Sequence, residues 1–108
     1  MPADDQKRTI HQLLVNRILQ GPGAAPVAQR ARAFDNAMLP ESLRLLLEKV
    51  ATSSAQVTDT DFATAIEAGF TDDQLFELVI CAAVGQSTRQ YEAGLAALAE
   101  AIADPETG

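Results

Sequence analysis

The sequence is poor in the side chains from which most metal and redox sites are built. It has one cysteine, Cys81, and one histidine, His11, among 108 residues. A single cysteine cannot form a disulfide within the chain, and nothing in the sequence indicates an oxidising compartment. No Cys-x-x-Cys or His-x-x-x-His pair occurs, so neither a zinc nor a haem site is expected. We therefore expect no bound metal and no cofactor.

Other common catalytic motifs are missing as well. A serine-histidine-acid triad would have to use His11, and no serine lies in a nucleophile-elbow sequence. The glycine-rich segment at residues 21–23 follows a predicted helix, whereas a phosphate-binding loop follows a strand. The chain therefore offers no standard motif for covalent catalysis or nucleotide binding.

Basic residues are fewer than acidic ones. Eight lysines and arginines stand against fifteen aspartates and glutamates, which gives a formal net charge of -7. Nucleic acids and anionic membranes bind basic surfaces, so neither is an expected partner. The longest apolar run, Leu78–Val84, is far shorter than the ~20 residues that span a bilayer. The polar, acidic start lacks the pattern of a signal peptide, and we expect a cytoplasmic protein.

Helical periodicity, in contrast, is abundant, and no strand-like alternation accompanies it. The sequence predicts an all-α fold, a single compact domain over residues 1–108 with about five to six helices. We interpret the helix of residues 5–20 as an oligomerisation or covering arm, and we expect Gly85 to kink or interrupt the chain before a last helix. The predicted helices cover residues 5–20, 26–36, 40–50, 58–68, 71–84 and 87–103. The apolar stripe of the first helix consists of Ile10, Leu13, Leu14, Arg17 and Ile18.

Two of the predicted helices begin with a capping signal. Thr58 is expected to cap one, and Thr71 the next, where Gln74 at the third helical position completes a capping box. Carboxylates complement the dipole in the first turn of a helix, and aspartates fill both of these turns. They are Asp59, Asp61, Asp72 and Asp73. We interpret these aspartates as features of helix ends in preference to a cation site.

The segment Leu78–Val84 is apolar almost all round. Its helix is therefore either the centre of a monomer core or part of a subunit contact. Small residues crowd the last third of the chain and let helices approach closely. Together these features favour a homo-oligomer. Cys81 lies in the same segment, where burial makes a thiol inert.

From Ser54 to Leu98, the sequence resembles the alkylhydroperoxidase-D-like and carboxymuconolactone decarboxylase superfamily. The similarity lies in residues 65–78, AIEAGFTDDQLFEL, where small residues and a glycine precede a capped helix. It continues through residues 82–85, AAVG, and in the spacing of Leu95 and Leu98. The resemblance covers nearly half of the chain and implies the alkylhydroperoxidase-D-like helical fold.

The residues that carry the chemistry of that superfamily are replaced in this sequence. Redox members have a Cys-x-x-Cys motif and a histidine in the helix that ends at this glycine. On the resemblance, those positions hold Ser54, Val57 and Asp61, and the glutamate that assists the thiols falls at Ser42, beside Glu41. An aspartate cannot replace an imidazole that titrates near neutrality. Thiol peroxidase activity is therefore expected to be absent, and decarboxylase-type activity, whose family members keep the histidine, is not expected either.

Three functions are compatible with these observations, in order of preference. The first is a non-redox, catalytically divergent member of the superfamily that acts as an oligomeric binding or structural protein, with a small-molecule ligand and a protein partner both left open. The second is a cofactor-independent lyase or isomerase on a small organic acid. It would use Asp61 and either Glu48 or Glu41 for acid–base catalysis, and Arg89 as a carboxylate clamp. The third is a small acidic subunit that binds a basic surface of another protein.

Overall fold

The computed structural model describes residues 2–103, with the side chains of residues 6–103. All regular structure in this part of the chain is helical, which confirms the predicted all-α class. A short 3₁₀ helix, η1, lies between the third and fourth α-helices. In chain order the elements are α1 (Pro2–Gln20), α2 (Val27–Asp35), α3 (Glu41–Thr52), η1 (Ser54–Gln56), α4 (Asp59–Glu67) and α5 (Asp72–Ala103).

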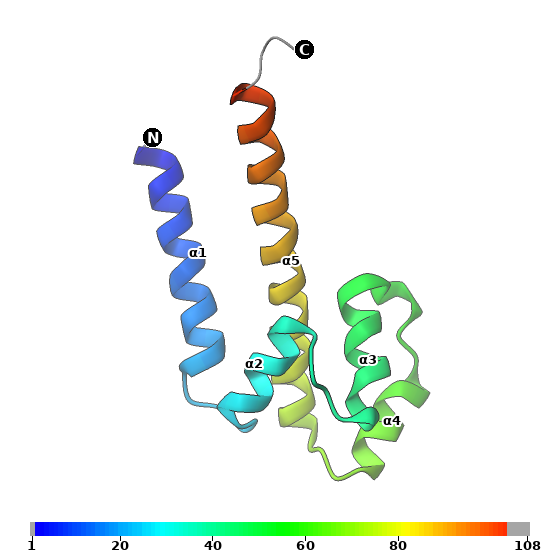
Figure 1. The fold of residues 1–108 in the computed structure, drawn as a ribbon. Helices are drawn as coiled ribbons and strands as arrows, with labels where there is room; N and C mark the ends of the chain where they lie inside the picture. The colour runs from blue at the N-terminus through cyan, green and yellow to red at the C-terminus, as the bar shows by residue number, and fades with distance from the viewer. Residues whose placement is uncertain (1, 104–108) are drawn as a thin grey trace.

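The N-terminal half of α5 is the centre of the fold, with α2 and α3 packed against it (Figure 1). Its fully buried residues include Leu78 and Cys81, in the segment that the sequence marks as apolar almost all round. Helix α3 contributes Leu43, Leu46 and Leu47 to the same core. The segment Leu78–Val84 therefore supplies the core of the single chain.

The expected break at Gly85 is wrong, because α5 runs without interruption from Asp72 to Ala103. The glycine serves another purpose: a Cβ atom at this position would overlap the backbone carbonyl of Phe34. Ala33 and Ala82 are also fully buried near this crossing. Three small residues thus let the backbones of α2 and α5 approach closely, which periodicity within one helix cannot reveal.

Both predicted N-caps and the predicted capping box of Thr71 and Gln74 are confirmed, and Thr58 forms a capping box as well. The backbone N–H of Asp61 donates to the hydroxyl of Thr58, and the Asp61 carboxylate accepts the backbone N–H of Thr58 in return. Thr71 and Gln74 exchange the equivalent pair of hydrogen bonds at the start of α5, at 3.0 and 3.1 Å. These local bonds define where α4 and α5 begin.

A buried arginine and a glutamate hold the loop between α1 and α2. Arg30 is only 5% exposed, and its guanidinium donates to the carbonyl oxygens of Ala25, Ile18 and Gly21 at 3.0, 3.1 and 2.7 Å. The Glu77 carboxylate, from α5, accepts the backbone N–H groups of Ala24 and Ala25. The loop is therefore fastened to both α2 and α5.

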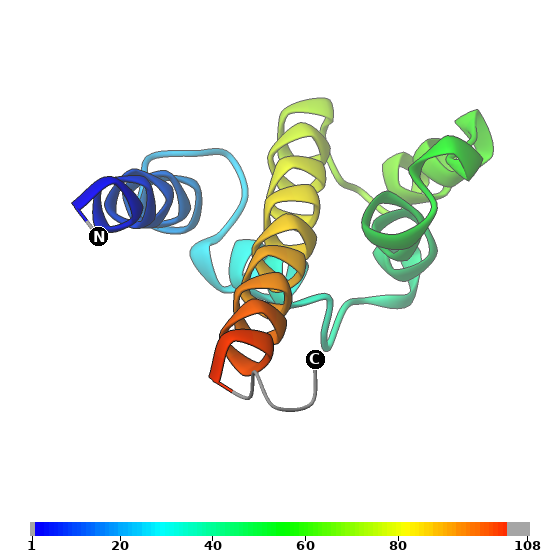
Figure 2. The same ribbon diagram turned by 90° about the horizontal axis from the view of Figure 1, so that it is seen from above.

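The molecule is elongated, with principal extents of 56 × 29 × 21 Å. Its radius of gyration is 16.7 Å, whereas ~13 Å is typical of a folded chain of this length. Helix α1 and the C-terminal half of α5 project away from the packed helices (Figures 1 and 2). We call α1 and residues 86–103 of α5 the arms. His11 joins them, because its Nε2 lies 2.9 Å from the Thr88 hydroxyl and its ring lies 5.8 Å from that of Tyr91.

The arms keep large apolar side chains in solvent. Ile10, Leu13 and Leu14 of the predicted apolar stripe are 64, 63 and 48% exposed. Of the predicted stripe, only Ile18 is half-buried, and helix α1 buries the neighbouring face, which carries Val15 and the half-buried Leu19. None of the helices in the described part of the chain is both long and apolar enough to cross a membrane.

Candidate functional site

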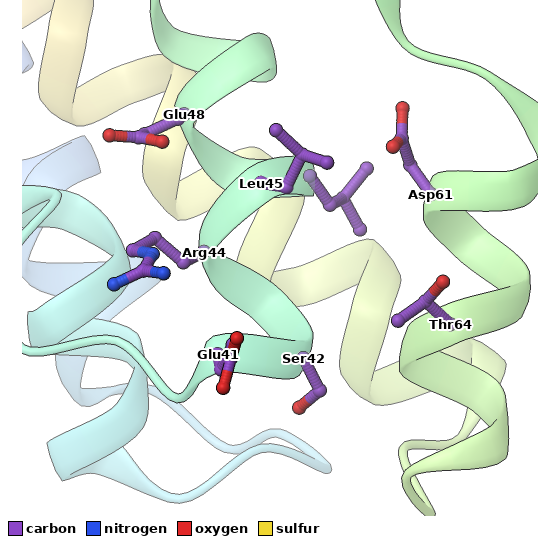
Figure 3. A pocket seen from close by; sticks show the side chains of 8 residues that line it. Glu41, Ser42, Arg44, Leu45, Glu48, Asp61 and Thr64 are labelled. Carbon is purple, nitrogen blue, oxygen red and sulfur yellow. The ribbon is translucent and has the colours of Figure 1, made fainter.

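A cleft of about 390 Å³ lies between α3 and α4 (Figure 3). It brings together three of the four residues that the sequence proposes as catalytic candidates: Glu41, Glu48 and Asp61. The complete lining consists of Glu41, Ser42, Arg44, Leu45, Leu46, Glu48, Asp61 and Thr64. Figure 3 shows Thr64 pointing from α4 toward α3, where Leu45 and Ser42 lie on the side nearer to α4. The side chains of Arg44 and Glu48 extend from α3 away from Asp61 (Figure 3).

Asp61 is the buried charge of this cleft, with 6% of its surface exposed. Its Oδ2 accepts the Thr58 backbone N–H at 2.9 Å and the Thr58 hydroxyl at 3.1 Å. The Lys49 ammonium donates to both carboxylate oxygens, at 3.0 Å to Oδ2 and 3.2 Å to Oδ1. Each oxygen of Asp61 therefore has at least one donor from its own chain.

These donors stabilise the ionised form of Asp61. The backbone N–H of Thr58, and after it Lys49, lower the pKa of the Asp61 carboxyl below its usual 3.8, although burial acts in the opposite direction. A carboxyl group that stays ionised at neutral pH cannot serve as a general acid. Asp61 caps α4 and binds Lys49, so the remaining carboxylates of the cleft are those of the exposed Glu41 and Glu48.

Arg89, the fourth catalytic candidate, does not line the cleft. Its Nη1 donates to the carbonyl oxygen of Phe34 at 2.6 Å, and its Nη2 donates to Gln86 Oε1 at 3.0 Å. Arg89 thereby satisfies a carbonyl at the C-terminal end of α2. The arginine among the residues that line the cleft is Arg44. The structure therefore does not bring Arg89 together with Asp61 as a carboxylate clamp requires.

The positions that the resemblance assigns to the redox motif lie in different environments. Ser54 is exposed at the start of η1, and Val57 is half-buried against the core. Asp61 lines the cleft, as does Ser42, the position of the thiol-assisting glutamate. None of these four side chains can form or reduce a disulfide.

The cysteine and the histidine both lie outside the cleft. Cys81 is fully buried. Burial raises the pKa of its thiol to about 11, and the nearby Glu77 acts in the same direction while Arg30 opposes it. The Thr88 hydroxyl donates to the Val84 carbonyl at 2.7 Å, so its oxygen accepts a hydrogen bond from His11. Both side chains therefore support the packing of helices.

The described residues include no group of three or more histidine, cysteine, aspartate or glutamate side chains that could hold a metal ion. The sequence interpretation missed Arg44, which lines the cleft, and Lys49, which binds the cleft residue Asp61. Lys49 and Asp61 are twelve positions apart on different helices, so no local spacing indicates their pairing. Arg44 lies one helical turn from both Glu41 and Glu48, and this spacing could have placed it on the same face.

Comparison with protein-family models gives no match, and comparison with curated proteins and with solved structures gives none either.

Proposed function

We propose that this protein is a non-redox, catalytically divergent member of the alkylhydroperoxidase-D-like and carboxymuconolactone decarboxylase superfamily, acting as a homo-oligomeric binding or structural protein. The bonding of Asp61 carries the proposal. At the position that the resemblance assigns to a histidine, the side chain is ionised, caps α4 and binds Lys49. A histidine in a redox or decarboxylase site must exchange a proton near neutral pH, and this carboxylate does not.

The state of Cys81 supports the absence of thiol chemistry. A thiol attacks peroxides and disulfides as the thiolate. The pKa of the Cys81 thiol is raised to about 11, and the side chain is fully buried. No second cysteine exists to resolve an oxidised intermediate. The chain thus offers neither an activated nor an accessible thiol.

The binding role is assigned to the cleft between α3 and α4. Its volume of about 390 Å³ falls at the lower end of the range of small-molecule sites, roughly 300–1,000 Å³. Glu41, Arg44 and Glu48 line it as exposed charged side chains. Charges of both signs suit a small polar ligand. A lyase or isomerase would have to use Arg44, in place of Arg89, to hold a substrate carboxylate.

Hydroperoxide consumption in the presence of a dithiol reductant tests the proposal. We expect the rate to equal that of buffer with reductant alone, and we expect the Cys81→Ser variant to give the same rate. Turnover that depends on the protein and disappears in Cys81→Ser would contradict the proposal. Native mass spectrometry of gently purified protein tests the binding role, because an occupied cleft adds a small mass to each chain.

A further inference from the structure

The two arms carry an apolar surface that nothing in the described chain covers. It consists of the exposed side chains of Ile10, Leu13, Leu14, Tyr91, Leu98 and Ile102. We call these six residues the arm surface. Their exposed fractions lie between 41 and 69%. On α5, the surface follows a regular stripe with Leu95, at steps of four, three and four residues from Tyr91 to Ile102. Such a spacing is typical of helices that pack against other helices along their length.

A helix that is apolar around its circumference is normally buried. From Ala93 to Ala103, α5 contains one charged residue, Glu100, and only Leu95 is not exposed. An isolated helical segment of this length is marginal in water. Contact with a further helical surface would stabilise the end of α5.

The chain exposes more surface than a compact monomer of its mass, and the difference is large enough for a dimer interface. The chain exposes 7301 Å², which is about 1,500 Å² more than the ~5,800 Å² expected for a compact monomer of 11.5 kDa. A stable interface of standard size removes roughly 800 Å² from each partner. The excess surface area is therefore large enough for such an interface. The packed helices, α2, α3 and the N-terminal half of α5, need not separate to form it.

The charges of the two arms are complementary. Helix α1 has three basic residues against Asp4 and Asp5, so its net charge is +1. Residues 86–103 of α5 have two acidic residues against Arg89, which donates to Phe34 and Gln86, so their net charge is −1. The charged residues concerned are Lys7, Arg8 and Arg17 on α1, and Glu92 and Glu100 on α5. The ion pair found within the described residues joins Lys49 to Asp61. It involves no charged residue of the arms. One chain thus presents both halves of a complementary pair.

We propose that the arm surface binds the arm surface of a second copy of this chain, with α1 of each copy lying against the C-terminal half of α5 of the other. A two-fold axis brings each basic arm beside the acidic arm of the partner, so that both contacts form at once. Because α1 and α5 run in opposite directions within one chain (Figure 1), four arms side by side make an antiparallel four-helix bundle. The inference rests on the oligomeric part of the proposed function and names its surface.

The first experiment compares two equally exposed leucines. Leu98, on the arm surface, and Leu45, on α3, are both 56% exposed. The molar mass of the full chain, measured by light scattering after size exclusion, is expected to be a multiple of 11.5 kDa. Leu98→Glu should reduce it to that of the monomer with helical circular dichroism retained, whereas Leu45→Glu should leave the oligomer intact.

The outcomes separate the surface from the oligomer itself. A monomeric wild-type chain would overturn both this inference and the oligomeric part of the proposed function. An oligomer that persists in Leu98→Glu, or one lost equally in both variants, would overturn the arm surface alone. Hydroperoxide turnover does not enter this measurement, so the absence of redox chemistry is tested independently.

Charge reversal tests the pairing without disturbing apolar packing. One variant carries Lys7→Glu and Arg8→Glu, and the other carries Glu92→Lys and Glu100→Lys. Each alone places like charges across the contact, so its dissociation constant should rise about tenfold or more. Mixed together, the two variants should form a heterodimer in native mass spectrometry, because every contact then joins opposite charges. Undiminished homodimers of either variant, or a mixture that forms no heterodimer, would overturn the pairing.

Discussion

Helix α5 passes through two different environments. From Asp72 to Gly85 it is covered by α2 and α3, and it buries Leu78 and Cys81 completely. Beyond Gly85 the same helix continues for eighteen residues, up to Ala103, with Leu98 and Ile102 largely in solvent. The two halves are similarly rich in apolar residues, yet one forms a core and the other an exposed arm. An apolar sequence can thus form a helix in either environment. Whether that helix is buried depends on the elements that pack against it.

The largest contrast between the halves is expected from truncating one leucine in each. Leu78→Ala should lower the free energy of unfolding by about 2–5 kcal/mol, because it opens a cavity in the core. Leu98→Ala, at a protein concentration that disfavours association, should cost less than about 0.5 kcal/mol. Urea unfolding followed by circular dichroism measures both values. Comparable losses at high dilution would mean that Leu98 is covered within its own chain.

Two glycines of α5 extend the comparison. A Cβ at Gly85 would meet the backbone of Phe34, whereas a Cβ at Gly94 has no other atom within 4 Å. Gly85→Ala should therefore destabilise by about 3 kcal/mol, because backbone cannot give way as a flexible side chain can. Gly94→Ala should stabilise by about 0.5–1 kcal/mol through helix propensity. Urea unfolding of both variants at high dilution measures these changes in stability. A Gly85→Ala variant as stable as wild type would contradict the close crossing of α2 and α5.

A smaller effect with a distinct pH dependence is expected at Asp61. Its pKa in the folded chain lies below the usual 3.8, so its stabilising contribution is fully present above that pH and is lost as the pH falls through the folded value. Asp61→Asn should lower stability at pH 7, and the gap to wild type should narrow below pH 4. Unfolding curves from pH 7 to pH 3 measure the gap. The exposed Asp59, in the same helical turn, provides the control, and an Asp59→Asn variant with the same pH-dependent gap would contradict this account.

The last contrast between the two halves of α5 concerns the reactivity of a cysteine in each. Cys81 should react with a thiol reagent at pH 8 only as fast as the chain unfolds, because it is buried and the pKa of its thiol is raised to about 11. A cysteine introduced by Ala93→Cys in a Cys81→Ser background should react at once, since Ala93 is exposed on the arm, on a different side of α5 from Leu98. Rapid labelling of Cys81 in the native state would show that the packed half opens.

The features that sequence alone predicts correctly depend on neighbours within a few residues. Thr58 is an N-cap as predicted, and Thr71 with Gln74 is the predicted capping pair at a separation of three. Such pairs lie within one helical turn, so local pattern identifies them. The apolar segment Leu78–Val84 is long enough to identify the central helix in the same way. The all-helical class follows from these signals.

The features that sequence misses depend on pairs of helices. Gly85 suggests a break until the carbonyl of Phe34 is placed beside it. Lys49 meets Asp61 only because α3 and α4 lie next to each other. In α1, two adjacent apolar stripes exist, and the one around Leu14 is exposed while the one around Val15 is buried. Periodicity cannot choose between stripes when both are apolar.

The same limit applies to the candidate site. Glu41, Glu48 and Asp61 line one cleft, as the sequence interpretation requires of a shared site. They lie on two neighbouring helices, α3 and α4. Arg89 lies on α5, where Phe34 and Gln86 accept its hydrogen bonds. Its role at the end of α2 depends on the crossing of α2 and α5, which the sequence does not encode as a motif.

Hydrogen exchange of the α5 amides at several protein concentrations tests most directly the claim that a second chain covers the arms. The account predicts that amides of residues 76–85 stay protected at every concentration, while those of residues 92–103 are protected at high concentration and exchange rapidly on dilution. Protection of the C-terminal half that does not change with concentration, whether strong or absent, would contradict it.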